Sequence, residues 1–259
     1  MQINSTYFTQ YRKKLGFSNQ TSLKDFFKAK DIVSSINYEY LESLNNRLFE
    51  VIEKINRVVP AEISIKKIDE FGCNNITNIY EKLKINGIIP KLNNQGRRPE
   101  EVYFSWMRGL VISNYFTKAI SHIFDTDTSN IQTIGDDDLV NIDSFKRTPK
   151  ADLEVTFGNN QKIRVEMQSG FQGINDIKQH KVLEAKKIKR ELGVSSVVVH
   201  IDLFNGQVAF VKIDDIDDES TNWITRQQME GQTVFNIEQN LFIWKLTDMP
   251  PKIYNISFE

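Results

Sequence analysis

Cysteine is scarce in this sequence, since Cys73 is the single one among 259 residues. One cysteine can form no internal disulfide and is too few for a cysteine-based zinc site, which agrees with a reducing compartment. Long apolar runs are also missing. No stretch approaches the roughly 18 apolar residues of a membrane span, and residues 1–16 lack the apolar segment of a signal peptide. We therefore expect a cytoplasmic protein with no membrane partner.

The sequence also lacks a surplus of positive charge, because its formal net charge is -1. Dedicated DNA-binding proteins usually carry a basic surplus that neutralises phosphates, so composition alone argues against a nucleic-acid partner. The charges are segregated, however, with basic residues gathered in 178–190 and acidic residues in 214–219. Hydrophobic residues make up 40% and charged residues 26% of the chain, as in a soluble globular protein of one large or two small domains.

Helical spacing of apolar residues dominates the N-terminal part. Residues 22–57 are predicted to be helical up to a stop at Pro60, with one apolar stripe made of Leu41, Leu44, Leu48, Ile52 and Ile55. Residues 63–90 are predicted to form two short helices separated by residues 71–73, an arrangement similar to a DNA-reading helix-turn-helix. Ile79 and Leu83 fall one residue later than that arrangement requires, and a plain helical hairpin is the alternative.

The Gly- and Asn-rich residues 91–99 are the best candidate for a domain boundary. They would separate a helical region at 1–95, which holds the possible helix-turn-helix, from a domain at 96–259 that ends in a hairpin. A helix from Pro99 to about Phe124 opens this second part. Short apolar runs then predict strands at 131–134, 151–157, 162–168, 195–204 and 207–213, with one helix at 174–192. We therefore expect an α/β fold in which helices flank a mixed β-sheet.

The strand pair 151–157 and 162–168 alternates apolar and polar residues. The apolar residues should share one buried face: Leu153, Val155, Phe157, Ile163, Val165 and Met167. A connecting loop of residues 159–161 would set Phe157 opposite Ile163 and Leu153 opposite Met167.

The other face of this pair then collects acidic side chains. The same register sets Glu154 opposite Glu166, and Asp152 opposite Gln168. Carboxylates this close repel one another unless a cation or a captured proton compensates their charge. A set of oxygen ligands suits Mg²⁺ or Mn²⁺, and Mg²⁺ keeps coordination positions open for water and phosphate oxygen. We therefore predict a magnesium site, which Mn²⁺ could also occupy.

The stretch PKADLEV at 149–155, followed by IRVEMQ at 163–168, resembles the PD-(D/E)XK nuclease superfamily. Within it, the chain is similar to type II restriction endonucleases that carry the E-x-Q variant of the motif. The resemblance covers about residues 99–210 and implies a restriction-endonuclease-like core. It also implies that Asp152, Glu166 and the main-chain carbonyl of Met167 bind the metal.

Gln168 stands where members of this superfamily usually have Lys. Gln cannot accept a proton at neutral pH, so the resemblance implies that Gln168 holds the attacking water by hydrogen bonds. A positive charge would come instead from one of three lysines, Lys150, Lys178 or Lys181. The family often adds a further acid, for which the candidates are Glu100, Glu101 and Glu154.

As a whole, the resemblance implies a Mg²⁺-dependent endonuclease that cleaves double-stranded DNA at a specific short site and leaves 5′-phosphates. A palindromic site favours a homodimer, and a restriction system adds a cognate methyltransferase as partner. The side chains predicted to contact DNA are Lys150, Lys178, Lys181, Arg226 and Gln227. The alternatives are a structure-selective repair or recombination nuclease, a DNA-binding regulator with a degenerate nuclease core, and a hairpin whose charged face is only solvated.

Overall fold

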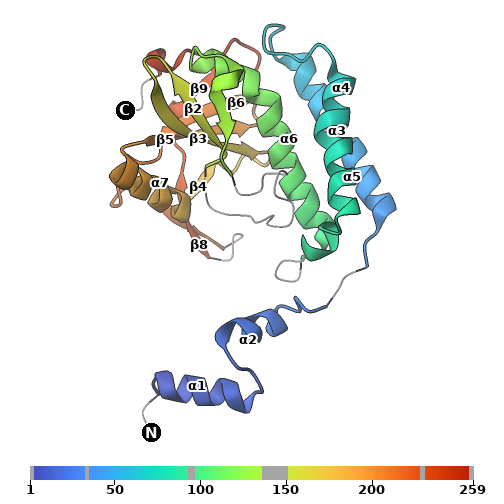
Figure 1. Cartoon of the computed structure of the whole chain (residues 1–259). Helices are drawn as coiled ribbons and strands as arrows, with labels where there is room; N and C mark the ends of the chain where they lie inside the picture. The colour runs from blue at the N-terminus through green and yellow to red at the C-terminus, as the bar shows by residue number, and fades with distance from the viewer. Residues whose placement is uncertain (1–2, 33–34, 93–96, 136–150, 228–230, 257–259) are drawn as a thin grey trace. The chain divides into compact units, whose positions relative to one another are not determined.

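A computed structural model describes residues 3–32, 35–92, 97–135, 151–227 and 231–256 (Figure 1). The chain divides into two compact units. Unit 1 comprises residues 1–49 and 76–108, and unit 2 comprises residues 50–75 and 109–259. The predicted boundary at 91–99 therefore falls inside unit 1. The chain instead passes between the units at residues 49/50, 75/76 and 108/109. None of the helices in the described ranges is both long and apolar enough to span a bilayer.

Unit 1 is helical, as predicted for the N-terminal region. Its elements are α1 Ser5–Lys14, α2 Gln20–Phe27, the start of α3 Tyr38–Val58, α5 Asn78–Ile85, the short 3-10 helix η2 Ile89–Leu92 and the start of α6 Pro99–Ile123. Asn4 and Asn19 cap the first two helices, each accepting a backbone N–H with its side chain. Tyr103 is fully buried and donates a hydrogen bond of 2.7 Å to Asn45 Oδ1.

The apolar stripe predicted for residues 41–55 lies on α3. Four of its five side chains are buried, and Leu44 is half-buried. The predicted stop at Pro60 is confirmed, since α3 ends at Val58. The helical prediction for 22–57 is only partly right, because α2 ends at Phe27 and α3 begins at Tyr38.

The predicted helix-turn-helix is wrong. Three elements follow one another without a turn: α4 Ile68–Gly72, the π-helix η1 Cys73–Thr77 and α5. A π-turn accommodates one residue more than an α-turn. This extra residue accounts for the displacement of Ile79 and Leu83 that is visible in the sequence, and Gly72 lies within a helix instead of making a turn.

Unit 2 is built around a six-stranded sheet, in the order β1-β2-β3-β5-β6-β9. Its strands are β1 Ile131–Thr133, β2 Leu153–Phe157, β3 Gln161–Gly170, β5 Ser195–Asp202, β6 Gln207–Lys212 and β9 Phe242–Lys245. The β3–β5 pair is parallel and the other neighbours are antiparallel. The predicted mixed sheet with flanking helices is thus confirmed, and all five predicted strands are present.

A second, three-stranded sheet was not predicted. It consists of β4 Asp176–Lys178, β8 Gln232–Asn236 and β7 Trp223–Arg226. The hairpin of β7 and β8 agrees with the predicted C-terminal hairpin. The helix expected from residue 174 begins only after β4, as α7 Gln179–Leu192. Three further 3-10 helices, η3 Thr128–Asn130, η6 Gln239–Leu241 and η7 Ile253–Asn255, complete the assigned elements.

Each face of the large sheet is covered by apolar packing. On one face, Ile177 of β4 and Val182 of α7 join a buried cluster with Val198 of β5 and Phe235 of β8. On the other face, the part of α6 that belongs to unit 2 contributes Phe116, whose ring meets Trp244 edge to face at 6.1 Å. The sheet therefore carries an interior on both sides.

The register of the β2–β3 hairpin differs from the predicted one by one residue pair. Leu153 lies opposite Val165, and Val155 opposite Ile163, so the predicted pairs of Phe157 with Ile163 and of Leu153 with Met167 are wrong. The faces are right, since the apolar residues are buried or half-buried on one side. A shift by an even number of residues keeps every side chain on its face, so alternation alone cannot choose between the two registers.

Candidate active site

Asp152 comes directly before β2, and Glu166 lies within β3. The β2–β3 pairing ends with Leu153 opposite Val165, so each of the two acids lies one residue beyond that last pair. Asp152 also reaches across to the next strand, where its Oδ2 accepts the Met167 backbone N–H at 2.7 Å. Asp152 and Glu166 are both half-buried. The structure therefore brings the Asp152 carboxylate to the peptide of Met167, the residue that follows Glu166 in the motif.

Glu154 does not join them, and its predicted place opposite Glu166 is wrong. Arg164 stands opposite Glu154 in the observed register. The Glu154 carboxylate pairs with Lys162 Nζ at 2.7 Å and lies 4.0 Å from Arg164 Nε. The predicted patch of three carboxylates is therefore wrong, and no group of three His, Cys, Asp or Glu residues suited to a metal occurs among the residues that the structure describes.

Glu166 is held by a lysine of the covering helix. Lys181 of α7 places its Nζ 2.8 Å from one carboxylate oxygen of Glu166 and 2.9 Å from the other. The side chains of Lys181 and Glu166 are 21% and 13% exposed, so the pair is partly shielded from water. Of the three candidate lysines, Lys181 therefore lies at the predicted site.

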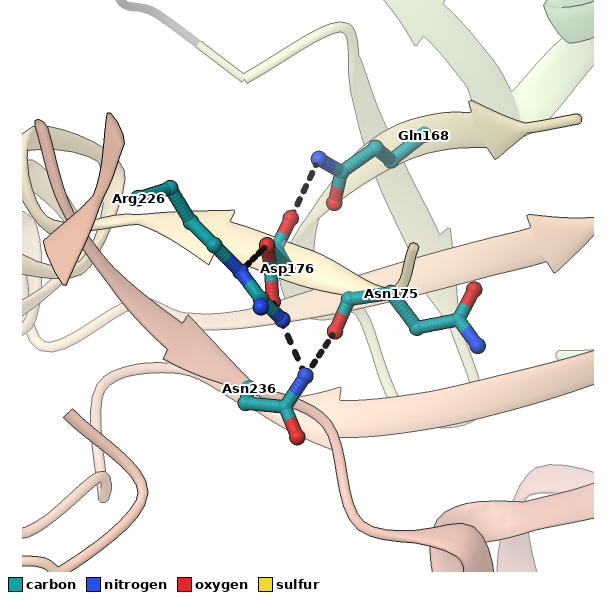
Figure 2. A network of polar contacts seen from close by, with 5 residues as sticks. All are labelled: Gln168, Asn175, Asp176, Arg226 and Asn236. Carbon is teal, nitrogen blue, oxygen red and sulfur yellow. Dashed lines mark hydrogen bonds and ion pairs between the residues drawn. The ribbon is translucent and has the colours of Figure 1, made fainter. Parts of the chain in front are cut away.

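Gln168 follows Glu166 on the same face of β3. Its Nε2 donates a hydrogen bond of 2.9 Å to the backbone oxygen of Asp176 in β4 (Figure 2). A peptide carbonyl only accepts hydrogen bonds, so the NH₂ group must be the part of the amide that faces Asp176. Gln168 Oε1 is buried and accepts no hydrogen bond from the described residues. The side chain is therefore fixed with a free oxygen acceptor.

The other predicted site residues lie elsewhere or outside the described ranges. Glu100 belongs to unit 1, where it is fully buried and accepts hydrogen bonds from the Asn37 backbone N–H at 2.9 Å and from Arg98 at 3.1 Å. Burial raises the pKa of Glu100, but these hydrogen bonds and the charge of Arg98 hold it below its usual value. Glu101 also belongs to unit 1 and is exposed.

The predicted DNA contacts are spread over unit 2. Lys178 is half-buried at the residue before α7, and Gln227 is exposed directly after β7. Arg226 is engaged by Asp176, to which it donates from Nε at 2.8 Å and from a terminal nitrogen at 3.1 Å. Lys150 lies outside the described residues.

A buried polar cluster beside Gln168 was not predicted. His200 is the neighbour of Gln168 on the parallel strand β5, and its Nε2 lies 2.8 Å from Asn175 Oδ1. Asn175 donates its amide NH₂ to Asp202, at 3.4 Å, so its oxygen must face His200, and Nε2 of His200 is the donor. Burial lowers the pKa of His200 to about 4, which keeps the ring neutral. The sequence signal was present, since His200 interrupts the otherwise apolar run 197–201 and Asp202 ends it.

The donor set at Asp152 and Glu166 fits a hard divalent cation. It offers two carboxylates and the carbonyl of Met167, and Mg²⁺ is typically bound through one or two carboxylates while it keeps several waters. No sulfur or imidazole lies in this set, which disfavours zinc. Lys181 balances part of the negative charge, so the site does not depend on a third carboxylate.

Comparisons with known proteins give a limited picture. No protein-family model matches the chain. A comparison with curated proteins also gives no match. Among solved structures, a Holliday junction resolvase, Hjc of Archaeoglobus fulgidus, is similar, with a TM-score of 0.33 and 9% sequence identity over 52% of this chain and 96% of that chain.

Proposed function

We propose that the chain is a Mg²⁺-dependent endonuclease that hydrolyses phosphodiester bonds of double-stranded DNA. The observation that carries this proposal is the hydrogen bond from the Met167 N–H to Asp152, which brings the Asp152 carboxylate to the residue that follows Glu166. Lys181 and Gln168, on the same face, add a cation and an oriented amide. A charged face that is only solvated does not account for Asp152, whose carboxylate accepts a backbone N–H of the neighbouring strand.

Each of these residues has a role that its contacts support. Asp152, Glu166 and the Met167 carbonyl would hold Mg²⁺, which, when bound, neutralises phosphate charge and lowers the pKa of a coordinated water. Lys181 would share its charge between Glu166 and the negative charge that develops on the phosphate. Gln168 would help to order the site from the fixed position that its bond to the Asp176 carbonyl gives it.

In its finer form, the proposal is a type II restriction endonuclease. It acts at a short site, leaves 5′-phosphates, functions as a homodimer and has a cognate methyltransferase that protects the host sites. A two-fold protein pair matches a two-fold DNA site, which is the reason for expecting a dimer. Sedimentation of the purified protein with and without DNA tests this part separately from catalysis.

A cleavage assay on purified protein tests the proposal. Phage DNA is incubated with Mg²⁺, with Mn²⁺ or with chelator, and a four-way junction is incubated in parallel. Discrete bands from phage DNA support a site-specific enzyme, and selective cutting of the junction instead points to a structure-selective nuclease. DNA that is bound equally with or without metal and is never cut would refute the proposal and favour a regulator.

Two matched carboxylate variants sharpen the assay. Glu166→Gln should abolish cleavage, because it removes a metal ligand while keeping the size of the side chain. Glu154→Gln removes a carboxylate from the same hairpin, but one that is paired with Lys162 and set apart from Glu166 by the register. This control should continue to cleave, and equal loss in both variants would contradict the site assignment.

A further inference from the structure

Asp176 in β4 accepts hydrogen bonds from residues of both sheets of unit 2. The residue is 5% exposed, and its carboxylate accepts the two-pronged contact from Arg226 at 2.8 and 3.1 Å. Asn236 of β8 adds an amide donor at 2.9 Å (Figure 2). Bidentate Arg–carboxylate pairs fix geometry as well as charge. The position of Asp176 is therefore set by β7 and β8, the strands that carry Arg226 and Asn236.

The same residue holds Gln168 with its backbone. The carbonyl oxygen of Asp176 accepts the Gln168 amide at 2.9 Å, while the carboxylate of Asp176 faces Arg226 (Figure 2). In addition, β4 leads directly into α7, so Lys181 lies only five residues after Asp176. Two side chains of the candidate active site thus depend on where β4 is held.

We propose that Arg226 and Asp176 are positioning residues that hold the Gln168 amide in one orientation, with its NH₂ on the Asp176 carbonyl. The inference rests on the proposed function for its consequence, which is that Gln168 keeps a fixed place beside Glu166 on β3. Arg226 then serves the reaction through Gln168 and does not read base edges.

The orientation of Gln168 can be measured without any cleavage. In NMR spectra of the whole chain, the side-chain NH₂ of Gln168 should exchange with solvent slowly, because it is bonded to a buried carbonyl. Arg226→Met and Asp176→Asn should each speed this exchange by about tenfold or more, since the loss of a bond to a partly buried partner is on the order of 1.4 kcal/mol. Arg226→Lys, which keeps the charge but loses the fork, should give an intermediate rate.

A control variant guards against a general loss of stability. Lys252 pairs with Asp125 in unit 2, and its side chain is 24% exposed, against 31% for Arg226. Lys252→Met therefore removes a basic side chain of comparable exposure far along the chain from Gln168, although its partner Asp125 is 71% exposed against 3% for Asp176. The Gln168 exchange should stay unchanged. If Arg226→Met leaves the Gln168 exchange at its native rate, or if Lys252→Met accelerates it equally, the proposal is overturned.

Kinetics test the consequence for catalysis. Arg226→Met should lower kcat by about tenfold with KM for DNA nearly unchanged, and adding Gln168→Ala should cause little further loss, because both changes remove one function. A raised KM with unchanged kcat would mean that Arg226 contacts DNA, and it would overturn the positioning role. If the native chain cleaves no DNA, the proposed function fails, and the exchange measurement still decides whether Arg226 positions Gln168.

Discussion

Replacing Asp152 by Asn separates the structural role of this side chain from its proposed catalytic role. Asp152 accepts the Met167 N–H at 2.7 Å, and Asn retains an oxygen that can accept the same bond. A hydrogen bond to a charged group contributes about 1.5–3 kcal/mol and a neutral one about 0.5–1.5 kcal/mol, so Asp152→Asn should lower the free energy of unfolding by about 1 kcal/mol. In a chain of this size, that loss lowers Tm by roughly 2–4 °C.

Cleavage should respond far more strongly than stability. Asn carries no charge to neutralise a divalent cation, so we expect single-turnover cleavage to fall by on the order of a thousandfold, which is about 4 kcal/mol of transition-state stabilisation. DNA binding, measured by fluorescence anisotropy, should remain close to that of the native chain. Asp152→Ala should lose the same activity but more stability, by about 1–3 kcal/mol, because the Met167 N–H then has no acceptor.

Thermal unfolding followed by circular dichroism and single-turnover cleavage in Mg²⁺ measure the two effects on the same samples. The reasoning is refuted if Asp152→Asn cleaves within about tenfold of the native rate. It is also refuted if activity disappears only in proportion to the fraction of unfolded protein, since Asp152 would then be a structural residue and no ligand.

Three further predictions follow from the described contacts. Lys181→Met should reduce cleavage by about a hundredfold in single-turnover assays, with DNA binding retained, because it leaves Glu166 without its cation; an unchanged rate would remove Lys181 from the site. The free energy of unfolding should be highest above pH 6.5 and fall by roughly 3 kcal/mol towards pH 4, because unfolded His200 takes up a proton over this range while the buried ring, with its pKa of about 4, does not. His200→Gln should flatten this part of a denaturation series, and an equally steep profile would assign the dependence to other groups. Glu100→Ala should destabilise the chain by about 1–3 kcal/mol by leaving the Asn37 N–H without its acceptor, yet leave the cleavage rate of folded protein intact. Loss of cleavage in that variant would instead support Glu100 as a further acid.

Alternation in the sequence predicted the strands and faces of the candidate site but could not predict which residues oppose one another. Burial of Leu153 and Val165 is satisfied by both registers, since they differ by an even number of residues. The choice depends on the loop, in which Gly158 and Asn160 adopt φ of 51° and 60°. The observed loop consists of residues 158–160 in place of 159–161. This difference of one pair replaces Glu166 by Arg164 as the neighbour of Glu154.

The small sheet was missed because its first strand is short and its sequence suits a helix. Ile177 lies at helical spacing from the apolar residues of α7, so residues 174–192 read as one helix. Only pairing with Val234 and Phe235, more than fifty residues away, makes 176–178 a strand. Long-range contacts of this kind leave no local periodic signal. The partners of Gln168 and Arg226 could not be foreseen for the same reason.

The β2–β3 turn determines which acidic side chains of the hairpin lie opposite one another. A shift of the β2–β3 register by one residue pair would leave the same apolar residues buried. It would, however, place Glu154 opposite Glu166 and Asp152 opposite Gln168. Residues 158–160 are exposed and join the strands at the end of the hairpin away from Asp152 and Glu166. Variation at this distant tip could therefore change how strongly the hairpin attracts a divalent ion while every acidic residue stays in the sequence.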